Sequence, residues 1–211
     1  MSADVVLLDY RLSNIRSARK ALEKLGADAR TAETGQEIGS PDAIVLPGVG
    51  HFGEAMRRIR DRDFVAPLAE AVEGGTPLLG ICLGMQLLFE SSEESPAEPG
   101  LGLLPGIVRP LVTDRKLPQI GWNAVRWNEG AALAPEGGDE RDAIYYFVHS
   151  FVVEPAEPGL VLGECEYGEA FCAVAGRENV IGVQFHPEKS SDAGLGLLGR
   201  WLAGVSERAA A

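Results

Sequence analysis

The stretch Leu78-Leu79-Gly80-Ile81-Cys82-Leu83-Gly84-Met85-Gln86-Leu87-Leu88-Phe89 decides the fold, because a short apolar run passes directly into a helical pattern. Residues 78–81 are predicted to form a strand and residues 85–89 a helix. Cys82 stands at the junction, with one glycine two positions before it and another two positions after it. Glycines in these places permit a sharp turn that leaves the cysteine side chain at its tip.

Strand-then-helix units also precede this junction. Residues 5–8 and 43–46 are apolar runs of strand length, and the second leads into the turn Pro47-Gly48-Val49-Gly50. The helix after the second run is expected from about residue 64 to 72. The helix after the first run carries an apolar face made of Ile15, Ala18, Leu22 and Leu25. Repeated units with wholly apolar strands predict a doubly wound, mostly parallel α/β sheet with helices on both faces, whose ligands bind at the carboxyl ends of the strands.

The second half of the sequence is rich in predicted strands. It follows a loop at residues 91–100 whose acids, prolines and glycines indicate a solvated segment. Strands are expected at residues 106–112, 124–127, 144–153, 160–167, 171–175 and 180–185, with a helix at 195–202. The predicted fold class is therefore α/β with an added strand-rich second half, and residues 1–211 are expected to form a single domain.

Charge and composition exclude several classes of partner and site. The chain has 19 Lys and Arg against 31 Asp and Glu, a formal net charge of −12, which repels nucleic acid and anionic lipid. No apolar run approaches the roughly 18 residues of a membrane span, and no leader pattern is present, so a cytoplasmic location is expected. The three cysteines, Cys82, Cys165 and Cys172, are odd in number and lack metal-ligand spacing, so neither disulfides nor a metal is expected.

A candidate base for the cysteine lies far downstream, in Gln184-Phe185-His186-Pro187-Glu188-Lys189-Ser190. Pro187 disfavours helix at His186, so His186 and Glu188 are expected to project to the same side of an extended segment. A carboxylate beside an imidazole can fix its tautomer and stabilise its charged form. Taken singly, each residue has a structural alternative: a packed cysteine, a strand-end histidine and a solvated glutamate.

Together these residues resemble the class I, triad-type glutamine amidotransferases, whose signature is Gly-x-Cys-x-Gly followed far downstream by His-Pro-Glu. The resemblance implies that Cys82 is the nucleophile, His186 the general acid and base, and Glu188 the residue that orients the imidazole, in hydrolysis of the glutamine side-chain amide. Finer motifs resemble the glutaminase subunits of imidazole glycerol phosphate synthases, enzymes of histidine synthesis. These motifs lie at residues 47–52, 80–88, 121–123, 146–151 and 183–190.

That resemblance implies a partner and further site residues. The partner would be a barrel-fold cyclase subunit in a heterodimer that receives the ammonia and binds the nucleotide, since this sequence has no phosphate-binding loop or dinucleotide fingerprint and no cofactor is expected. Backbone amides of Leu83 and of the turn Gly48, Val49 and Gly50 are candidates for the oxyanion hole, although a Pro-Gly turn is common without that role. Gln86 lies one helical turn after Cys82 and could hold substrate, or could cap the helix or be exposed. Candidates for the subunit interface are Trp122, Tyr146, His149 and Lys189, with core packing or solvation as alternatives.

One loop departs from the family pattern. Relatives carry Asp-Tyr-Gly-x-Gly-Asn where this chain has Asp9-Tyr10-Arg11-Leu12-Ser13-Asn14, and loss of two glycines is expected to change the backbone of this turn near the partner.

Three other functions remain open from sequence. An amidotransferase of purine, pyrimidine, folate or tryptophan synthesis is one; Met85, the Gly-Trp-Asn stretch and Lys189-Ser190 favour the histidine pathway. A cysteine peptidase and an inactive scaffold are the others.

Overall fold

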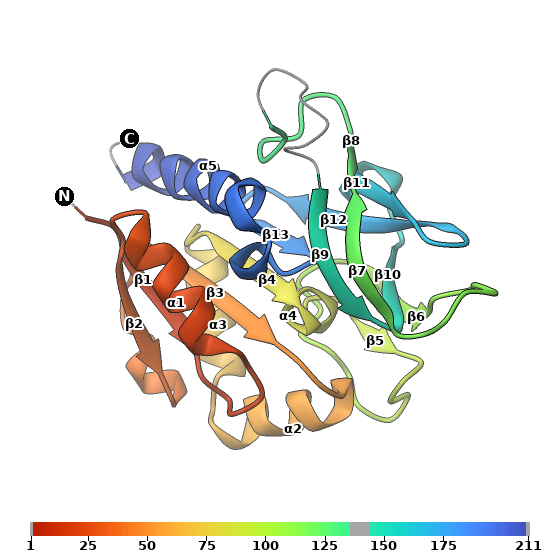
Figure 1. The fold of residues 1–211 in the computed structure, drawn as a ribbon. Helices are drawn as coiled ribbons and strands as arrows, with labels where there is room; N and C mark the ends of the chain where they lie inside the picture. Colours follow the sequence, from red (N-terminus) through yellow and green to blue (C-terminus); the bar gives the residue numbers. More distant parts are fainter. Residues whose placement is uncertain (1, 136–143, 210–211) are drawn as a thin grey trace.

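The computed structural model describes residues 2–135 and 144–209, which fold around one large mixed sheet (Figure 1). Five neighbouring strands at one end of this sheet run parallel, in the order β2, β1, β3, β4, β13. Their bounds are Asp28–Ala32, Asp4–Leu8, Ala43–Gly48, Leu78–Cys82 and Val180–Val183 respectively. The predicted parallel α/β sheet is confirmed, and the carboxyl ends of β3, β4 and β13 lie side by side.

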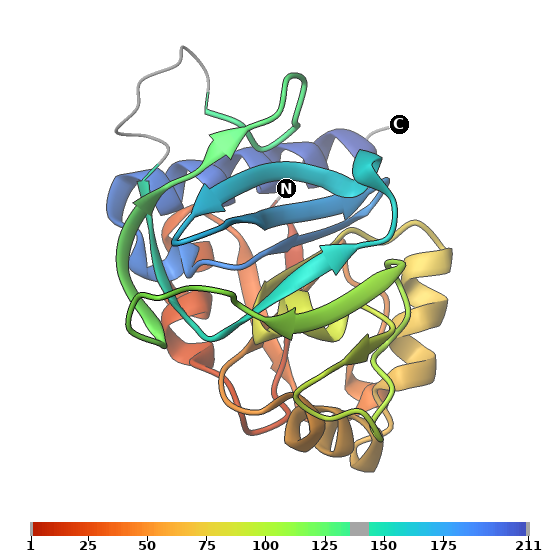
Figure 2. The ribbon, with the colours of Figure 1, turned by 90° about the vertical axis from the view of Figure 1, so that its right-hand side faces the viewer.

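Antiparallel strands extend the sheet beyond β13, in the order β12, β10, β6, with the short β5 parallel to β6 at the edge. β11 pairs with both β12 and β8, while β7 and β9 form a separate antiparallel pair, which lies at the left edge of the view in Figure 2. The bounds are β5 Ser91–Ser92, β6 Gly106–Pro110, β7 Gln119–Ala124, β8 Arg126–Trp127, β9 Ile144–His149, β10 Phe151–Pro155, β11 Val161–Glu166 and β12 Ala170–Arg177.

Helices cover both faces of the parallel part, and each face has its own apolar core. Val5 and Leu7 of β1 point into the core shared with α1 and α5, whereas Val6 and Leu8 point into the core shared with α2, α3 and α4. The helices are α1 Ile15–Lys24, α2 Phe52–Asp61, α3 Val65–Glu73, α4 Leu83–Leu87 and α5 Ser191–Ala209. Short 3-10 turns are η1 Gly35–Glu37, η3 Pro158–Leu160 and η4 Pro187–Lys189. Among the described residues no helix combines the length and apolarity needed to cross a membrane.

Several elements differ from the sequence predictions. β2, α2 and most of β7 were not predicted, although the buried Phe52, Ala55, Met56 and Ile59 of α2 follow helical spacing. The single strand expected at residues 144–153 is two strands in two sheets, because the chain bends at Ser150 between β9 and β10. This bend matters because it brings residues 148–151 to the carboxyl end of β4.

Candidate active site

Cys82 occupies a strained turn between β4 and α4. Its φ of 56° lies in the left-handed region, where residues other than glycine have a higher conformational free energy. Residues strained in this way cluster at functional sites. The flanking glycines are required by close approach: a Cβ at Gly80 would lie 2.8 Å from the carbonyl oxygen of Gly84. The predicted turn is therefore present, with α4 starting directly against β4.

His186 and Glu188 meet as the sequence predicted. His186 is extended, η4 follows it, and its Nδ1 lies 2.9 Å from Oε1 of Glu188. Both side chains are only 3% exposed. Ser190 holds the surrounding backbone, since its Oγ donates to the His186 carbonyl and accepts from the Tyr146 amide. The carboxylate therefore orients the imidazole, and the two hydrogen bonds of Ser190 connect its loop to β9.

The charge state of His186 reflects its neighbours. Burial by itself lowers the pKa of this imidazole, but hydrogen bonds with Cys82 and Glu188, together with the negative charges of both partners, raise it to about 9. An imidazolium is therefore favoured at neutral pH. The ring and the carboxylate are hydrogen-bonded, and the ring and the thiol line the same pocket, as a nucleophile, a general acid and an orienting group require.

A pocket of about 300 Å³ opens on Cys82, a volume suited to a small metabolite. It is lined by Val49, Gly50, Cys82, Leu83, Gln86, Glu94, Pro118, Val148, His149, Ser150, Phe151, His186 and Lys189. Gln86 is 5% exposed, so the alternative that it is an exposed helix residue is wrong. Glu94 was missed, because its loop was expected to be solvated; its Oε2 accepts from the Phe52 amide at 2.7 Å while the residue lines the pocket.

The turn after β3 lies beside the cysteine, since Gly48 pairs with Cys82 across β3 and β4. A Cβ at Gly48 would fall 2.2 Å from the Tyr10 hydroxyl, which explains the glycine. The Val49 amide, a predicted oxyanion donor, instead donates to the Leu12 carbonyl at 2.9 Å. In this arrangement it is not available to a ligand.

The loop that departs from the family pattern has a left-handed backbone at one non-glycine position. Arg11 adopts a φ of 67°, in the left-handed region that favours glycine. The Arg11 amide donates to the Asp9 carboxylate at 2.9 Å, and its guanidinium pairs with Glu33. These contacts hold the left-handed conformation without glycine.

The four predicted interface residues divide into two groups. Trp122 is 51% exposed and its ring lies 5.7 Å from that of Tyr146 across β7 and β9, and Lys189 is exposed at the pocket. His149 is instead buried, with its ring against Phe147 and Phe171 and its Nδ1 3.0 Å from the Phe151 carbonyl. A surface role for the His149 side chain does not agree with this placement.

We expect His149 to make the fold sensitive to acid. Burial lowers the pKa of His149 to about 4, despite the hydrogen bond to Phe151, so the folded protein excludes a proton that the unfolded chain binds below about pH 6.5. Stability should therefore fall as the pH drops from 6.5 to 4, by up to roughly 3 kcal/mol. Urea unfolding at several pH values measures this loss. His149→Phe should lack that part of the pH dependence and His51→Phe should keep it; equal slopes in both variants would contradict the expectation.

The other two cysteines have the properties of packed residues. Burial raises the pKa of Cys165 to about 11 and that of Cys172 to about 12. Both are free thiols in the interior. Within the described residues no cluster of histidine, cysteine and carboxylate side chains could hold a metal ion.

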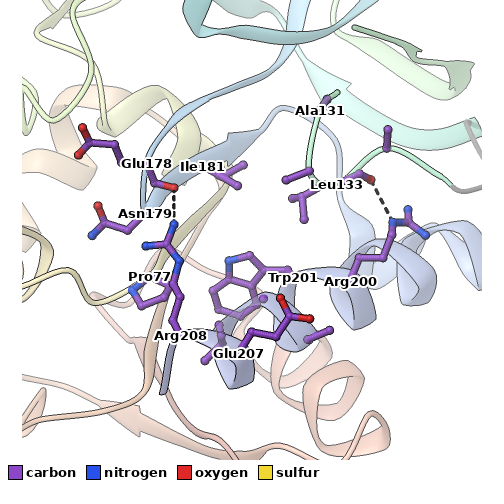
Figure 3. A pocket seen from close by; sticks show the side chains of 15 residues that line it. Pro77, Ala131, Leu133, Glu178, Asn179, Ile181, Arg200, Trp201, Glu207 and Arg208 are labelled. Atoms are coloured by element: carbon purple, nitrogen blue, oxygen red, sulfur yellow. Dashed lines mark hydrogen bonds between the residues drawn. The ribbon is translucent and has the colours of Figure 1, made fainter. Parts of the chain in front are cut away.

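A larger cavity of about 500 Å³ lies along α5 and does not contain the chemistry of a site (Figure 3). Each of its two arginines donates to a backbone carbonyl at 3.1 Å, Arg200 Nε to Leu133 and Arg208 Nη2 to Glu178, while Nη2 of Arg200 is buried without a hydrogen-bond partner among the described residues. Its described lining includes neither cysteine nor histidine. The smaller pocket at Cys82 is therefore the candidate active site.

Comparisons with known proteins agree with this location. The family model for glutamine amidotransferase class-I matches residues 6–198. Proteins described as imidazole glycerol phosphate synthase subunit HisH are similar over nearly their whole length. The one from Desulfitobacterium hafniense is 45% identical over 93% of both chains, and the one from Rhodopirellula baltica is 41% identical over 96% of this chain and 98% of its own.

Solved structures support the fold at lower identity. The structure of PurLQS from Thermotoga maritima has a TM-score of 0.75 at 21% identity, and covers 97% of this chain and 100% of its own. A crystal structure described as glutamine amidotransferase has a TM-score of 0.72 at 22% identity, and covers 94% and 98%. The arrangement of strands and helices is thus shared well beyond close relatives.

Proposed function

Because the chain belongs to the class I glutamine amidotransferases, and within them to the HisH subunits of imidazole glycerol phosphate synthase, we propose that Cys82, His186 and Glu188 hydrolyse the amide of L-glutamine. The products are L-glutamate and ammonia. A separate cyclase subunit, the partner in a heterodimer, uses the ammonia to form imidazole glycerol phosphate and an aminoimidazole carboxamide ribonucleotide in L-histidine biosynthesis. Residues 1–211 form the single amidotransferase domain, and the cytoplasm, where such synthesis takes place, is its location.

The observation that carries this proposal is that the Cys82 thiol and the His186 imidazole line one small pocket, with the Glu188 carboxylate hydrogen-bonded to that imidazole. The Cys82 thiolate attacks the carboxamide carbon, and imidazolium His186 protonates the departing ammonia. Water then hydrolyses the glutamyl thioester with His186 as the base, which regenerates the thiol. Glu188 keeps the ring oriented in both steps.

Charged groups at the pocket fit the rest of the substrate. The Glu94 carboxylate is complementary to the α-ammonium of glutamine, and the exposed Lys189 to its α-carboxylate. Gln86 uses its amide nitrogen on protein acceptors, so only its oxygen remains to accept from substrate.

The oxyanion hole is incomplete in this arrangement, which supports control by the partner. The Leu83 amide follows the nucleophile directly, but the Val49 amide is bonded to Leu12. Release of that bond, with rotation of the turn at residues 48–50, would supply a second donor to the tetrahedral intermediate. An isolated chain is therefore expected to be a weak glutaminase.

The test is a glutaminase assay in which purified cyclase and its nucleotide substrate are titrated into the chain. Glutamate release should be slow from the chain alone and should rise to saturation with the cyclase, because the partner favours the complete oxyanion hole. Absence of glutamate release even with both cyclase and nucleotide would overturn the function.

The same titration tests the docking surface. Ile120 and Trp122 of β7, 61% and 51% exposed, form an apolar face next to the pocket residue Pro118. Trp122→Ala should raise the cyclase concentration for half-maximal activation about tenfold, as loss of a central aromatic contact does. Val65→Ala is the control. Val65 is 39% exposed on α3, and α3 packs into the core that it shares with α2 and α4 rather than into the core beneath β9. Unchanged activation by the Trp122 variant would place the partner elsewhere.

A further inference from the structure

Two buried glutamines connect a backbone carbonyl of β10 to the cysteine sulfur. Nε2 of Gln86 lies 3.0 Å from the Phe151 carbonyl oxygen and 3.1 Å from Oε1 of Gln184. Nε2 of Gln184 lies 3.9 Å from Sγ of Cys82. Gln184 is fully buried and Gln86 is 5% exposed, so little solvent competes for these contacts.

The orientation of each amide follows from the acceptor at the start of this series. A carbonyl oxygen can only accept, so the Gln86 group facing Phe151 must be its NH₂. The same NH₂ also faces Gln184, which must therefore present its oxygen to Gln86. As a result the NH₂ of Gln184 points at the sulfur, because the reverse orientation of Gln184 would set its NH₂ against the NH₂ of Gln86.

Besides His186, which lines the same pocket, the sulfur has one backbone acceptor and one amide donor near it. The Val148 carbonyl oxygen is 3.8 Å from Sγ and can accept from a thiol, but it offers nothing to a thiolate. The Gln184 amide can donate to either form, and hydrogen bonds to ionised groups are the stronger ones. Of these two contacts, only that with Gln184 favours the ionised nucleophile.

We propose that Gln184 is a positioning residue that stabilises and aims the Cys82 thiolate, with Gln86 fixing the direction of its amide. The inference rests on the proposed function, because it gives a role to a neighbour of the same nucleophile. Gln184 has no part in proton transfer: its donated N–H stays on nitrogen while Cys82 exchanges its proton with His186.

The test measures the thiol directly and needs no glutamine turnover. In a Cys165→Ala, Cys172→Ala background, Cys82 is the only cysteine. Its alkylation by iodoacetamide, followed by mass spectrometry across pH 5 to 10, reports the thiolate fraction. Gln184→Met keeps the length of the side chain and removes the donor, and should slow alkylation at pH 7 about tenfold, the effect of one lost hydrogen bond to a charged group. At high pH, where the thiol is ionised in every variant, the rates should converge.

Matched variants separate this role from general damage to the fold. Gln86→Met frees the Gln184 amide to turn and should slow alkylation at pH 7 by a smaller factor, about threefold. Gln184→Glu places a carboxylate at the sulfur and should slow it more than Gln184→Met. The control is Gln119→Met, since Gln119 is fully buried but donates to Asn123; its alkylation should match the parent.

Two results would overturn the inference. One is parental alkylation at pH 7 in both Gln184 variants. The other is a decrease in the alkylation rate by the same factor at every pH, which indicates a distorted site rather than altered ionisation of Cys82. If Gln184→Met fails to fold, Gln184→Glu and Gln86→Met decide the question by the same criteria. A failure of the proposed function would appear differently, as absence of glutamate release by the unaltered chain with cyclase and nucleotide.

Discussion

Cys82→Ala is expected to lower glutamine-dependent synthesis by the complex about 10⁴-fold or more, while added ammonia still supports the cyclase. Removal of a covalent nucleophile leaves no alternative group on the amide carbon, and the remaining triad members act only through it. The smaller alanine fits the space of Cys82, so the fold and the docking surface should persist. The measurement compares product formation with glutamine and with ammonium salt as nitrogen source.

Cys165→Ala provides the matched control for that experiment. Cys165 is also a buried free thiol, but it does not line the pocket at Cys82. This variant should keep glutamine-driven activity close to that of the unaltered chain. Two results would contradict the role given to Cys82: either Cys82→Ala retains glutamine-driven product formation, or it loses ammonia-driven product formation as well.

The parts of the fold and site that could be predicted from sequence depend on local patterns. The turn at Cys82 follows from glycine spacing within five residues, and the pairing of His186 with Glu188 follows from one proline between them. Apolar runs such as β1 predict a strand buried on both faces, which the two separate cores confirm.

The parts that could not be predicted depend on contacts between distant segments. Gln184 touches residues 98 and 102 positions earlier in the chain, and Glu94 meets an amide 42 positions away. No periodicity in the sequence predicts contacts between residues so far apart in the chain. His149 is different, because alternation along β9 buries Tyr145, Phe147 and His149 on one side, so counting by twos predicts a buried His149.

The position of the nucleophile also depends on how closely α4 approaches β3, and Gly84 is the residue that permits this. A Cβ at Gly84 would lie 1.7 Å from the carbonyl oxygen of Leu46 and 2.8 Å from its carbonyl carbon. These are backbone atoms of a strand paired on both sides, with β1 and β4. No rotamer change can relieve such an overlap, so either the strand or the helix start must move.

Gly84→Ala is therefore expected to destabilise the protein by about 3 kcal/mol or more, a large share of the roughly 5–15 kcal/mol that stabilises a typical domain. Thermal unfolding followed by circular dichroism should show a Tm lower by about 10 °C. Gly204→Ala is the opposite control: it lies within α5, a Cβ there meets nothing within 4 Å, and alanine should add up to about 1 kcal/mol of helix stability. A Gly84→Ala protein with an unchanged Tm would show that α4 can draw back from β3 without cost, and the close approach would then not be what fixes Cys82.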